Sequence, residues 1–412
     1  MGNLFKIAVR NLRRYKRRTI LTASLITVGV VFVIVFIGVS GSFKNMMVGQ
    51  ITDSMLGHIQ IHRQGYVASI DNLPLNLNIQ AQGAERLEAL LRRQPEVAAV
   101  SPRIKFGGMF STFVETTNIR LNGIFPDREF QTVPLLPGRV AQGKKTLARG
   151  EIYIPDLLHK GMGAKVGDTV VIVATNQDGS VNGKQFKVAG VLESATGPGG
   201  RDGYIHILDA MEILRMEVMD ISELAIRLKD FDELHSVTRR LEQLVARERN
   251  PQGKPLYEVH SWEKLSPFFN IARMIDVLTF FIKLMLIAIV LISIMNVMIM
   301  AVYERIREIG TISAIGTLPG KIRSMFVLEG FCLGVLGAVV GNVIGGIILY
   351  VINLSRITFE FGRQSGFVLA VQFNPRDILM ISLIVILVSV LASLQPAFKA
   401  SRMEPINALR HV

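Results

Sequence analysis

His58 and His62 are the two residues of this chain whose type and spacing come closest to a metal site. They stand four positions apart in the segment GHIQIH, residues 57–62, whose alternation of apolar and polar residues predicts a β-strand. At the rise of a strand, positions four apart are separated by roughly 13 Å, so one ion cannot bind both side chains. We therefore expect an ordinary surface strand here.

The rest of the sequence lacks the residue spacing that catalysis requires. The nucleotide-binding pattern G-x-x-x-x-G-K-[ST], the zinc-protease pattern H-E-x-x-H and the hydrolase pattern G-x-S-x-G are all absent. Cys332 is the only cysteine, which excludes an internal disulfide and cysteine-based zinc or iron–sulfur sites. The carboxylates of residues 44–272 are expected to be solvated charges. We therefore predict no catalytic residue, no metal site and no cofactor on this chain, which argues against a membrane-anchored enzyme.

The composition excludes a purely water-soluble protein. Half of the 412 residues are hydrophobic, 19% are charged, and the mean hydropathy is +0.38. Four stretches without a charged residue are each long enough to cross about 30 Å of hydrocarbon. They comprise residues 20–38, 284–302, 330–352 and 378–398. The first is too long for a secretory signal peptide, so we predict four transmembrane helices.

The net charge of +13 belongs almost entirely to the membrane portion. Residues 44–272 hold 27 Lys or Arg against 26 Asp or Glu, which disfavours nucleic-acid binding by that region. Seven basic residues precede the first span: Lys6, Arg10, Arg13, Arg14, Lys16, Arg17 and Arg18. By the positive-inside rule, both termini and the loop 303–329 are cytoplasmic, whereas residues 44–272 and 353–377 lie outside. Residues 3–18 are periodic enough to form an amphipathic helix at the membrane interface.

The large outside region is predicted to be an α+β domain. Strand, helix and strand patterns follow one another at 57–62, 84–93 and 97–104, and again at 223–228, 233–249 and 256–260. This order indicates a split β-α-β-β-α-β sheet. Between the two units, short strands are expected at 110–116, 119–124, 151–155, 169–175 and 185–192, with a hairpin turn at 177–180. They predict a β-barrel-like insertion, and a turn is expected in the glycine-rich segment 196–203.

Small residues and isolated charges mark the membrane helices. Gly337, Gly341 and Gly345 recur every four residues, a spacing that lets helices pack closely in lipid. Asp276 and Lys283, near the outer end of the second span, are expected to reach the membrane interface, with a place on a transport pathway as the alternative.

The loop after the second span has the composition of a docking surface. Glu304, Arg305, Arg307 and Glu308 form a mixed-charge helical turn, beside an apolar stripe of Ile309, Ile312 and Ile315. A short helix with charges of both signs and apolar side chains suits contact with another protein. The alternative is a helix that lies in the lipid headgroups.

The same loop carries a family resemblance. Its pattern ERxREIGxxxAxG, residues 304–316, resembles the FtsX-type permease domain of ATP-binding cassette (ABC) transporters, the MacB/FtsX family that includes the LolC/LolE type. The basic start KIAVRNLRRYKRRTILT and the segment PAFKASRMEPINALR, residues 396–410, resemble the ends of these permeases. The segments GEIYIPDLLHKGMGAKVGDTVVIV and FKVAGVLES are similar to their outside domain.

The resemblance implies a non-catalytic permease that relays force from ATPase subunits to the outside domain. On this analogy Glu304, Arg305, Arg307, Glu308 and Gly310 lie on or beside the coupling helix that engages the ATPase. The chain begins almost at the membrane, so we expect the ATPase, with its ATP and Mg²⁺, on separate polypeptides. Two ATPase copies and a second or sister permease are the expected partners in the inner membrane, and lipoprotein release the expected activity. Export of macrolides, peptides or lipids, and regulation of a cell-wall hydrolase, are the alternatives.

The predicted organisation follows from these segments in order. It comprises a basic helix (1–18), a first transmembrane helix (19–43), an outside domain (44–272, insertion about 107–195), a second transmembrane helix (273–303), a coupling loop (304–325), a third transmembrane helix (326–353), a short outside loop (354–377), a fourth transmembrane helix (378–398) and a cytoplasmic tail (399–412).

Overall fold

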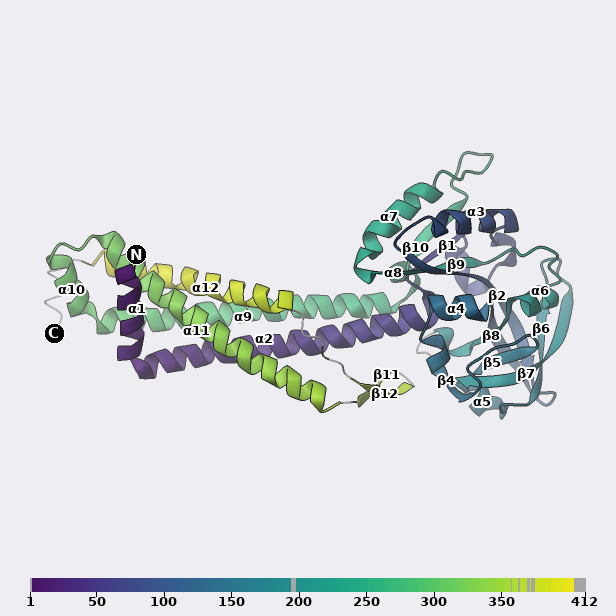
Figure 1. Cartoon of the computed structure of the whole chain (residues 1–412), viewed down its shortest axis with the longest axis horizontal. Coiled ribbons are helices and arrows are strands. Elements are labelled where there is room, and N and C mark those ends of the chain that lie inside the picture. The colour runs from purple at the N-terminus through teal and green to yellow at the C-terminus, as the bar shows by residue number, and fades with distance from the viewer. Residues whose placement is uncertain are drawn as a thin grey trace. The chain divides into compact units, whose positions relative to one another are not determined.

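The computed structural model describes residues 2–193, 198–356, 358–361, 364–368, 371 and 375–403. The chain divides into two compact units (Figure 1). A helical unit consists of residues 1–44, 273–357 and 368–412, and a mixed α/β unit consists of residues 45–272 and 358–367. Most of the predicted tail and part of the predicted loop 354–377 lie outside the described residues.

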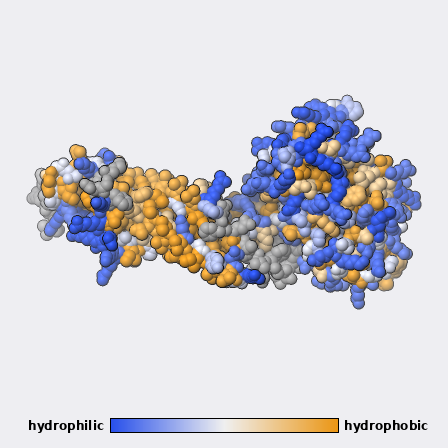
Figure 2. Space-filling model, in the orientation of Figure 1, coloured by the Kyte–Doolittle hydropathy of each residue, from blue (hydrophilic) through white to orange (hydrophobic). Residues whose placement is uncertain are grey.

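The helical unit contains four helices that are long and apolar enough to cross a membrane, which confirms the predicted membrane class. Figure 2 shows that the surface of these helices is mostly hydrophobic. The helices of this unit are α1 (Gly2–Arg14), α2 (Lys16–Ile51), α9 (Phe268–Glu304), α10 (Ile306–Ala314), α11 (Pro319–Leu354) and α12 (Pro375–Ser401). In α2 a π-helical turn, η1 (Thr52–Leu56), extends the carboxyl end.

The glycines of α11 face two neighbouring helices. On one side each of three glycines meets a β-branched residue of α2: Gly337 meets Ile26, Gly341 meets Val30 and Gly345 meets Ile34. A Cβ atom added to Gly341 would lie only 2.6 Å from Cγ1 of Val30. On the other side, Gly330 and Gly334 lie against serines of α12. The backbone of α11 can approach both helices because these positions have no side chain.

The mixed α/β unit is built on a four-stranded antiparallel sheet in the order β10-β1-β9-β2. The strands are β1 (Ile59–Arg63), β2 (Val97–Ser111), β9 (Glu223–Leu228) and β10 (Tyr257–Ser261). Helix α3 (Ala81–Arg92) connects β1 to β2, and α7 (Leu234–Val245) connects β9 to β10. This is the predicted split β-α-β-β-α-β arrangement.

The insertion closes into a barrel that shares β2 with the first sheet. The added strands are β3 (Thr116–Ile124), β4 (Val140–Gly143), β5 (Glu151–Pro155), β6 (Thr169–Thr175), β7 (Val181–Leu192) and β8 (Asp202–His206). Their pairing runs β2-β3-β8-β5-β7-β6 and returns from β6 to β2, with β4 attached to β7. The predicted hairpin turn joins β6 to β7, where Gly179 has a φ of +82°.

Two of the predicted segments form different elements in the structure. The strand expected at 110–116 does not form as one element, because β2 ends at Ser111 and β3 begins at Thr116 after a turn. The glycine-rich segment 196–203 is a turn only in part, because Asp202 and Gly203 pair with β3 as the start of β8. Residues 194–197 lie outside the described residues.

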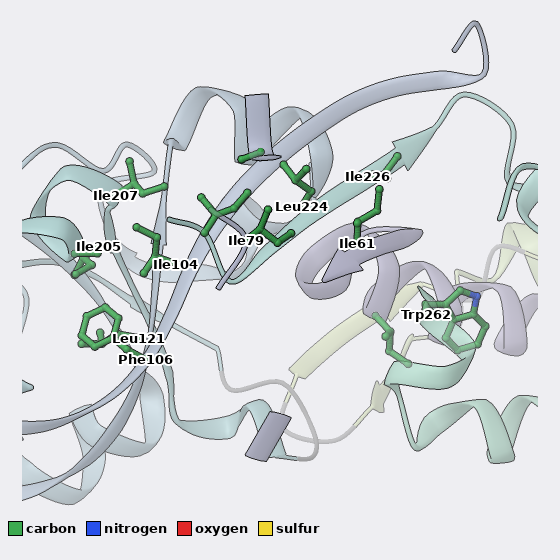
Figure 3. Close-up of a cluster of buried hydrophobic side chains, with 14 of the residues drawn as sticks. Ile61, Ile79, Ile104, Phe106, Leu121, Ile205, Ile207, Leu224, Ile226 and Trp262 are labelled. Carbon is green, nitrogen blue, oxygen red and sulfur yellow. The ribbon is translucent and has the colours of Figure 1, made fainter. Parts of the chain in front are cut away.

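Short helices fill the connections of this unit. They are α4 (Pro126–Thr132), α5 (Asp156–Met162), α6 (Ile207–Ile213) and α8 (Trp262–Leu265), with 3-10 turns η2 (Val67–Asn72), η3 (Leu75–Leu77), η4 (Leu136–Arg139), η5 (Pro198–Arg201) and η6 (Phe231–Glu233). Strands β11 (Thr358–Phe361) and β12 (Gln364–Val368) form a separate hairpin. Figure 3 shows part of the buried core, to which β1 contributes Ile61 and β9 contributes Leu224 and Ile226.

A group of charged residues is buried in the same unit. The guanidinium of Arg103, on β2, is 2.7 Å from Glu129 and 2.8 Å from Glu223, and both carboxylates are fully buried. The Lys105 ammonium lies 2.9 Å from Glu223. Burial alone would raise the pKa of Glu223, but Lys105, His62 and Arg103 lower it well below its usual value. The expectation that the carboxylates of this domain are solvated is therefore wrong for Glu129 and Glu223.

Replacing Arg103 by methionine should destabilise the mixed α/β unit strongly. The change leaves two buried carboxylates without their shared cation, which typically costs about 3–5 kcal/mol. Fluorescence of Trp262, the only tryptophan and a core residue of this unit, would report unfolding in urea. Arg92→Met, which removes the exposed Arg92 side chain from its ion pair with Glu88 and leaves Glu88 paired with Arg128, should change stability by less than about 1 kcal/mol. Equal effects of the two variants would contradict a role for the buried cluster in stability.

Adding one methyl group at Gly341 should loosen the helical unit. The new Cβ overlaps Val30, and forced repacking of this kind costs typically about 1–3 kcal/mol. The rate at which a maleimide labels Cys332, which is buried in α11, would measure the opening of the helices. The matched variant Gly41→Ala, with no neighbouring atom within 4 Å, should leave this rate unchanged. Faster labelling in both variants, or in neither, would count against close packing at Gly341.

Candidate functional site

The mixed-charge loop forms a short helix between two membrane-spanning helices. Helix α9 ends at Glu304, and Arg305 interrupts the helix with a φ of −110° and a ψ of 17° before α10 begins at Ile306. After α10, Gly316 adopts a φ of +93°, a conformation that favours glycine. Pro319 is the first residue of α11. Proline is favoured there because the backbone N–H of a first helical residue has no partner within the helix. The local sequence thus accounts for both ends of this segment.

The five residues predicted to couple to an ATPase do not share one environment. Glu304, Arg307 and Glu308 are exposed, whereas Arg305 and Gly310 are buried. The side chain of Arg305 is only 2% exposed and points to Glu329 of α11, with N–O distances of 3.3 and 3.4 Å. Arg305 is therefore placed as an internal residue, and a docking role for the five residues stays a prediction.

Glu329 joins Arg305 to the first membrane-spanning helix. Its buried carboxylate also accepts a hydrogen bond from Nη2 of Arg18 at 3.0 Å. The other nitrogen of that guanidinium, Nη1, is 3.1 Å from Glu304. These four residues, Arg18, Glu304, Arg305 and Glu329, are called the arginine–glutamate cluster below. The cluster ties together α2, the α9–α10 junction and α11.

Tyr15 completes this region at the elbow between α1 and α2. The Arg305 guanidinium lies over its ring at 4.4 Å, and that of Arg18 at 5.4 Å, distances that suit cation–π attraction. Arg14 forms an exposed ion pair with Glu308 of α10 at 3.4 Å. From the sequence, Tyr15 is expected only on the apolar face of the amphipathic helix 3–18 and Glu329 only as part of the family pattern, and neither is assigned a contact. The available signal was a carboxylate directly before the uncharged stretch 330–352, since such a group needs a cationic partner.

The apolar stripe predicted for the loop is divided between the interior and the surface. Ile309 is buried, whereas Ile312 is 38% and Ile315 is 80% exposed. Leu318, just before α11, is 65% exposed. These three exposed residues and the neighbouring Arg307 and Glu308 are called the α10 surface. It combines large apolar side chains with charges of both signs, a composition typical of protein contacts.

His62 of β1 and His58, directly before this strand, are not on a surface strand, which corrects the expectation. His58 is buried, and its Nδ1 accepts a hydrogen bond from the backbone N–H of Leu228 at 3.1 Å. His62 is fully buried, with Nε2 3.4 Å from Glu223. Both are buried because β1 lies between β9 and β10 instead of at a sheet edge. Within the described ranges, no group of three or more His, Cys, Asp or Glu side chains is placed to hold a metal ion.

Asp276 forms an ion pair with Lys44 at 2.6 Å, with the aspartate side chain 60% exposed. Lys283 lines a small cavity of about 70 Å³ together with Asp377 and apolar residues of α2, α9 and α12. Their expected place at the membrane interface stays a prediction, with a place on a transport pathway as its alternative.

Two family models match the chain. Residues 19–244, more than half of the chain, match the MacB-like periplasmic core domain, and residues 280–405 match the FtsX-like permease C-terminal domain. The lipoprotein-releasing system transmembrane protein LolC of Neisseria meningitidis serogroup B is 24% identical over 98% of both chains. The macrolide export ATP-binding/permease protein MacB of Nitrobacter winogradskyi is 27% identical over 56% of this chain and 34% of its own.

Among solved structures, the periplasmic region of MacB from Actinobacillus actinomycetemcomitans matches 51% of this chain and 92% of its own, with 16% identity and a TM-score of 0.35. The matched domain models and the four apolar helices agree in their order along the chain. This chain belongs to the MacB/FtsX family of ABC transporter permeases.

Proposed function

We propose that the chain is the membrane-spanning subunit of a lipoprotein-releasing ABC transporter and relays the work of separate ATPase subunits to its periplasmic domain. Support for the cargo comes from LolC, which the chain matches over almost its whole length. The corresponding match to the macrolide exporter, whose name includes an ATP-binding part, covers only a third of that protein. Two ATPase copies, which would bind ATP and Mg²⁺, and a second or sister permease complete the proposed assembly.

The proposed orientation places the α10 surface in the cytoplasm. The seven basic residues before the first span favour a cytoplasmic amino terminus in the inner membrane. Helix α1 and α10 lie on the same side of the helical unit, as the ion pair between Arg14 and Glu308 requires. An ATPase subunit in the cytoplasm would therefore reach α10 directly.

The observation that carries the proposal is an exposed apolar and charged helix lying over buried ion pairs. An ATPase subunit that binds the α10 surface would bury Ile312, Ile315 and Leu318, which are exposed in this chain. Movement of α10 would be passed on through Arg305, because its ion pair with Glu329 is buried and costly to break. The cluster is connected to helices α2 and α9. Helix α2 ends at Ile51 and helix α9 begins at Phe268, close to the first and last residues of the periplasmic domain.

Export of a macrolide-like or other small amphipathic molecule is the second candidate, favoured by the similarity to MacB. The two candidates share the force relay and differ in the cargo. Mass spectrometry of the purified complex, trapped with a non-hydrolysable ATP analogue, would identify the bound passenger. An acylated protein supports lipoprotein release, and a small molecule alone supports export.

Replacing Ile315 by aspartate should weaken binding of the ATPase subunits at least tenfold. The change puts a charge at the centre of the α10 surface without affecting the interior, because Ile315 is mostly exposed. Copurification of the ATPase with the tagged permease would measure this effect. Leu354→Asp, at the opposite end of α11 and 72% exposed, is the matched control and should retain full binding. Normal copurification with Ile315→Asp would remove the α10 surface from the proposed contact.

Replacing Glu329 by glutamine should uncouple ATP hydrolysis from cargo release. The variant keeps the α10 surface intact but removes the carboxylate shared by Arg18 and Arg305. We expect ATPase copurification within twofold of wild type and at least a tenfold loss of ATP-dependent release of a labelled lipoprotein from proteoliposomes.

Two controls separate uncoupling from general destabilisation. Gly341→Ala should loosen the same helices while leaving the cluster in place. At a temperature where this variant remains folded, its rate of lipoprotein release should therefore fall much less than that of Glu329→Gln. Arg305→Lys keeps the cation and should retain partial coupling. If Glu329→Gln releases lipoprotein at the wild-type rate, the relay through the cluster is refuted.

A further inference from the structure

An apolar groove lies at the elbow between α1 and α2. Its volume is about 390 Å³, within the range of about 300–1,000 Å³ usual for small-molecule sites. Apolar residues of three helices line it, among them Leu12 of α1, Ile20 of α2, and Phe331, Cys332 and Leu336 of α11. The groove is open on one side, because Ile20 and Leu336 are 65% and 44% exposed. An extended hydrocarbon chain would fit such a surface.

Two cations at the groove have no ion-pair partner among the described residues. Arg13 and Lys16 contribute to its lining, and neither makes an ion pair with any described residue. Their neighbours Arg14 and Arg18 differ, because Arg14 pairs with Glu308 and Arg18 pairs with Glu304 and Glu329. The basic elbow is thus divided into a side neutralised by acids of this chain and a side with two charges beside apolar surface that no described acid neutralises. Charge complementarity on that second side favours an anionic ligand.

The position of the groove fits the boundary between headgroups and acyl chains. Arg13 and Lys16 precede the uncharged stretch that starts at Ile20, and the α11 residues of the groove follow directly on Glu329 at the start of the uncharged stretch 330–352. A basic amphipathic helix such as α1 lies at the same depth. The charged rim and the apolar floor are therefore arranged in the order in which a phospholipid presents its phosphate and its acyl chains.

We propose that the elbow groove binds an anionic phospholipid, with one acyl chain along Leu12, Phe331 and Leu336 and the headgroup phosphate on Arg13 and Lys16. The site would hold a resident lipid beside the first membrane-spanning helix. Its assignment to the cytoplasmic leaflet rests on the orientation given under the proposed function. The binding itself does not depend on that orientation.

The test uses the full chain in nanodiscs of phosphatidylcholine that contain a phosphatidylglycerol probe with a photoreactive diazirine in its acyl chain. Illumination should label peptides containing residues 9–20 or 331–336. Arg13→Ser combined with Lys16→Ser should lower this labelling about tenfold, because each basic residue near an anionic surface contributes several-fold to binding. The control variant, Arg10→Ser combined with Arg17→Ser, removes the same charge from exposed positions that do not line the groove. This variant should lower the labelling less than twofold.

Further arms distinguish the lipid from other occupants. A phosphatidylcholine probe with the same reactive chain should label the groove much more weakly, and an excess of glycerol phosphate should not compete, because the acyl chain supplies part of the binding. Leu336→Trp, which fills the groove without changing charge, should reduce labelling by phosphatidylglycerol. Three outcomes would overturn the proposal. They are equal labelling by both lipids, an equal loss of labelling in the two double-serine variants, and loss of labelling once partner subunits are bound. None of these outcomes depends on ATP hydrolysis or cargo.

Discussion

The helical unit depends on the need of a buried carboxylate for cationic partners. Glu329 is fully buried at the start of an apolar stretch, and the guanidinium groups of Arg18 and Arg305 are the cations that accompany it. Because these partners come from α2 and from the α9–α10 junction, satisfying one carboxylate fixes the mutual position of three helices. Helix α10 cannot move alone without straining the buried ion pair between Arg305, at its start, and Glu329, and breaking such a pair costs several kcal/mol. A local electrostatic requirement thereby becomes a mechanical connection between a surface helix and the membrane spans.

In the mixed α/β unit the corresponding constraint is the length of β2. Its first half pairs with β9, and its second half pairs with β3 and β6, so one strand belongs to both the sheet and the barrel. Gly108 lies where β6 begins to pair, and a Cβ there would be 3.0 Å from the carbonyl oxygen of Val173. The barrel and the sheet are therefore joined through one continuous strand and are closely packed at Gly108.

The sequence allowed the elements to be predicted more reliably than the contacts between charges. Uncharged length identified the four apolar helices, and alternation identified β1 and β9, because both signals are local. The glycines at 337, 341 and 345 pointed to close helix packing, and the structure places them against α2. Burial of Glu223 could not be predicted, because its partner Arg103 lies 120 residues away in the sequence. His62 was placed on the surface for the same reason: a strand's pattern does not reveal whether it lies at the edge or in the middle of a sheet.

The elbow shows why composition alone could not separate the roles of neighbouring basic residues. The segment RRYKRR, residues 13–18, places five cations around Tyr15, and nothing in its local sequence distinguishes them. The break between α1 and α2 turns Arg14 and Arg18 towards acids that lie about 290 or more residues later, whereas Arg13 and Lys16 face an apolar groove. A cation paired inside the protein stabilises one arrangement of helices, and an unpaired cation at the membrane attracts an external anion. The same residue type thus supports two functions, and the three-dimensional position of the acids decides between them.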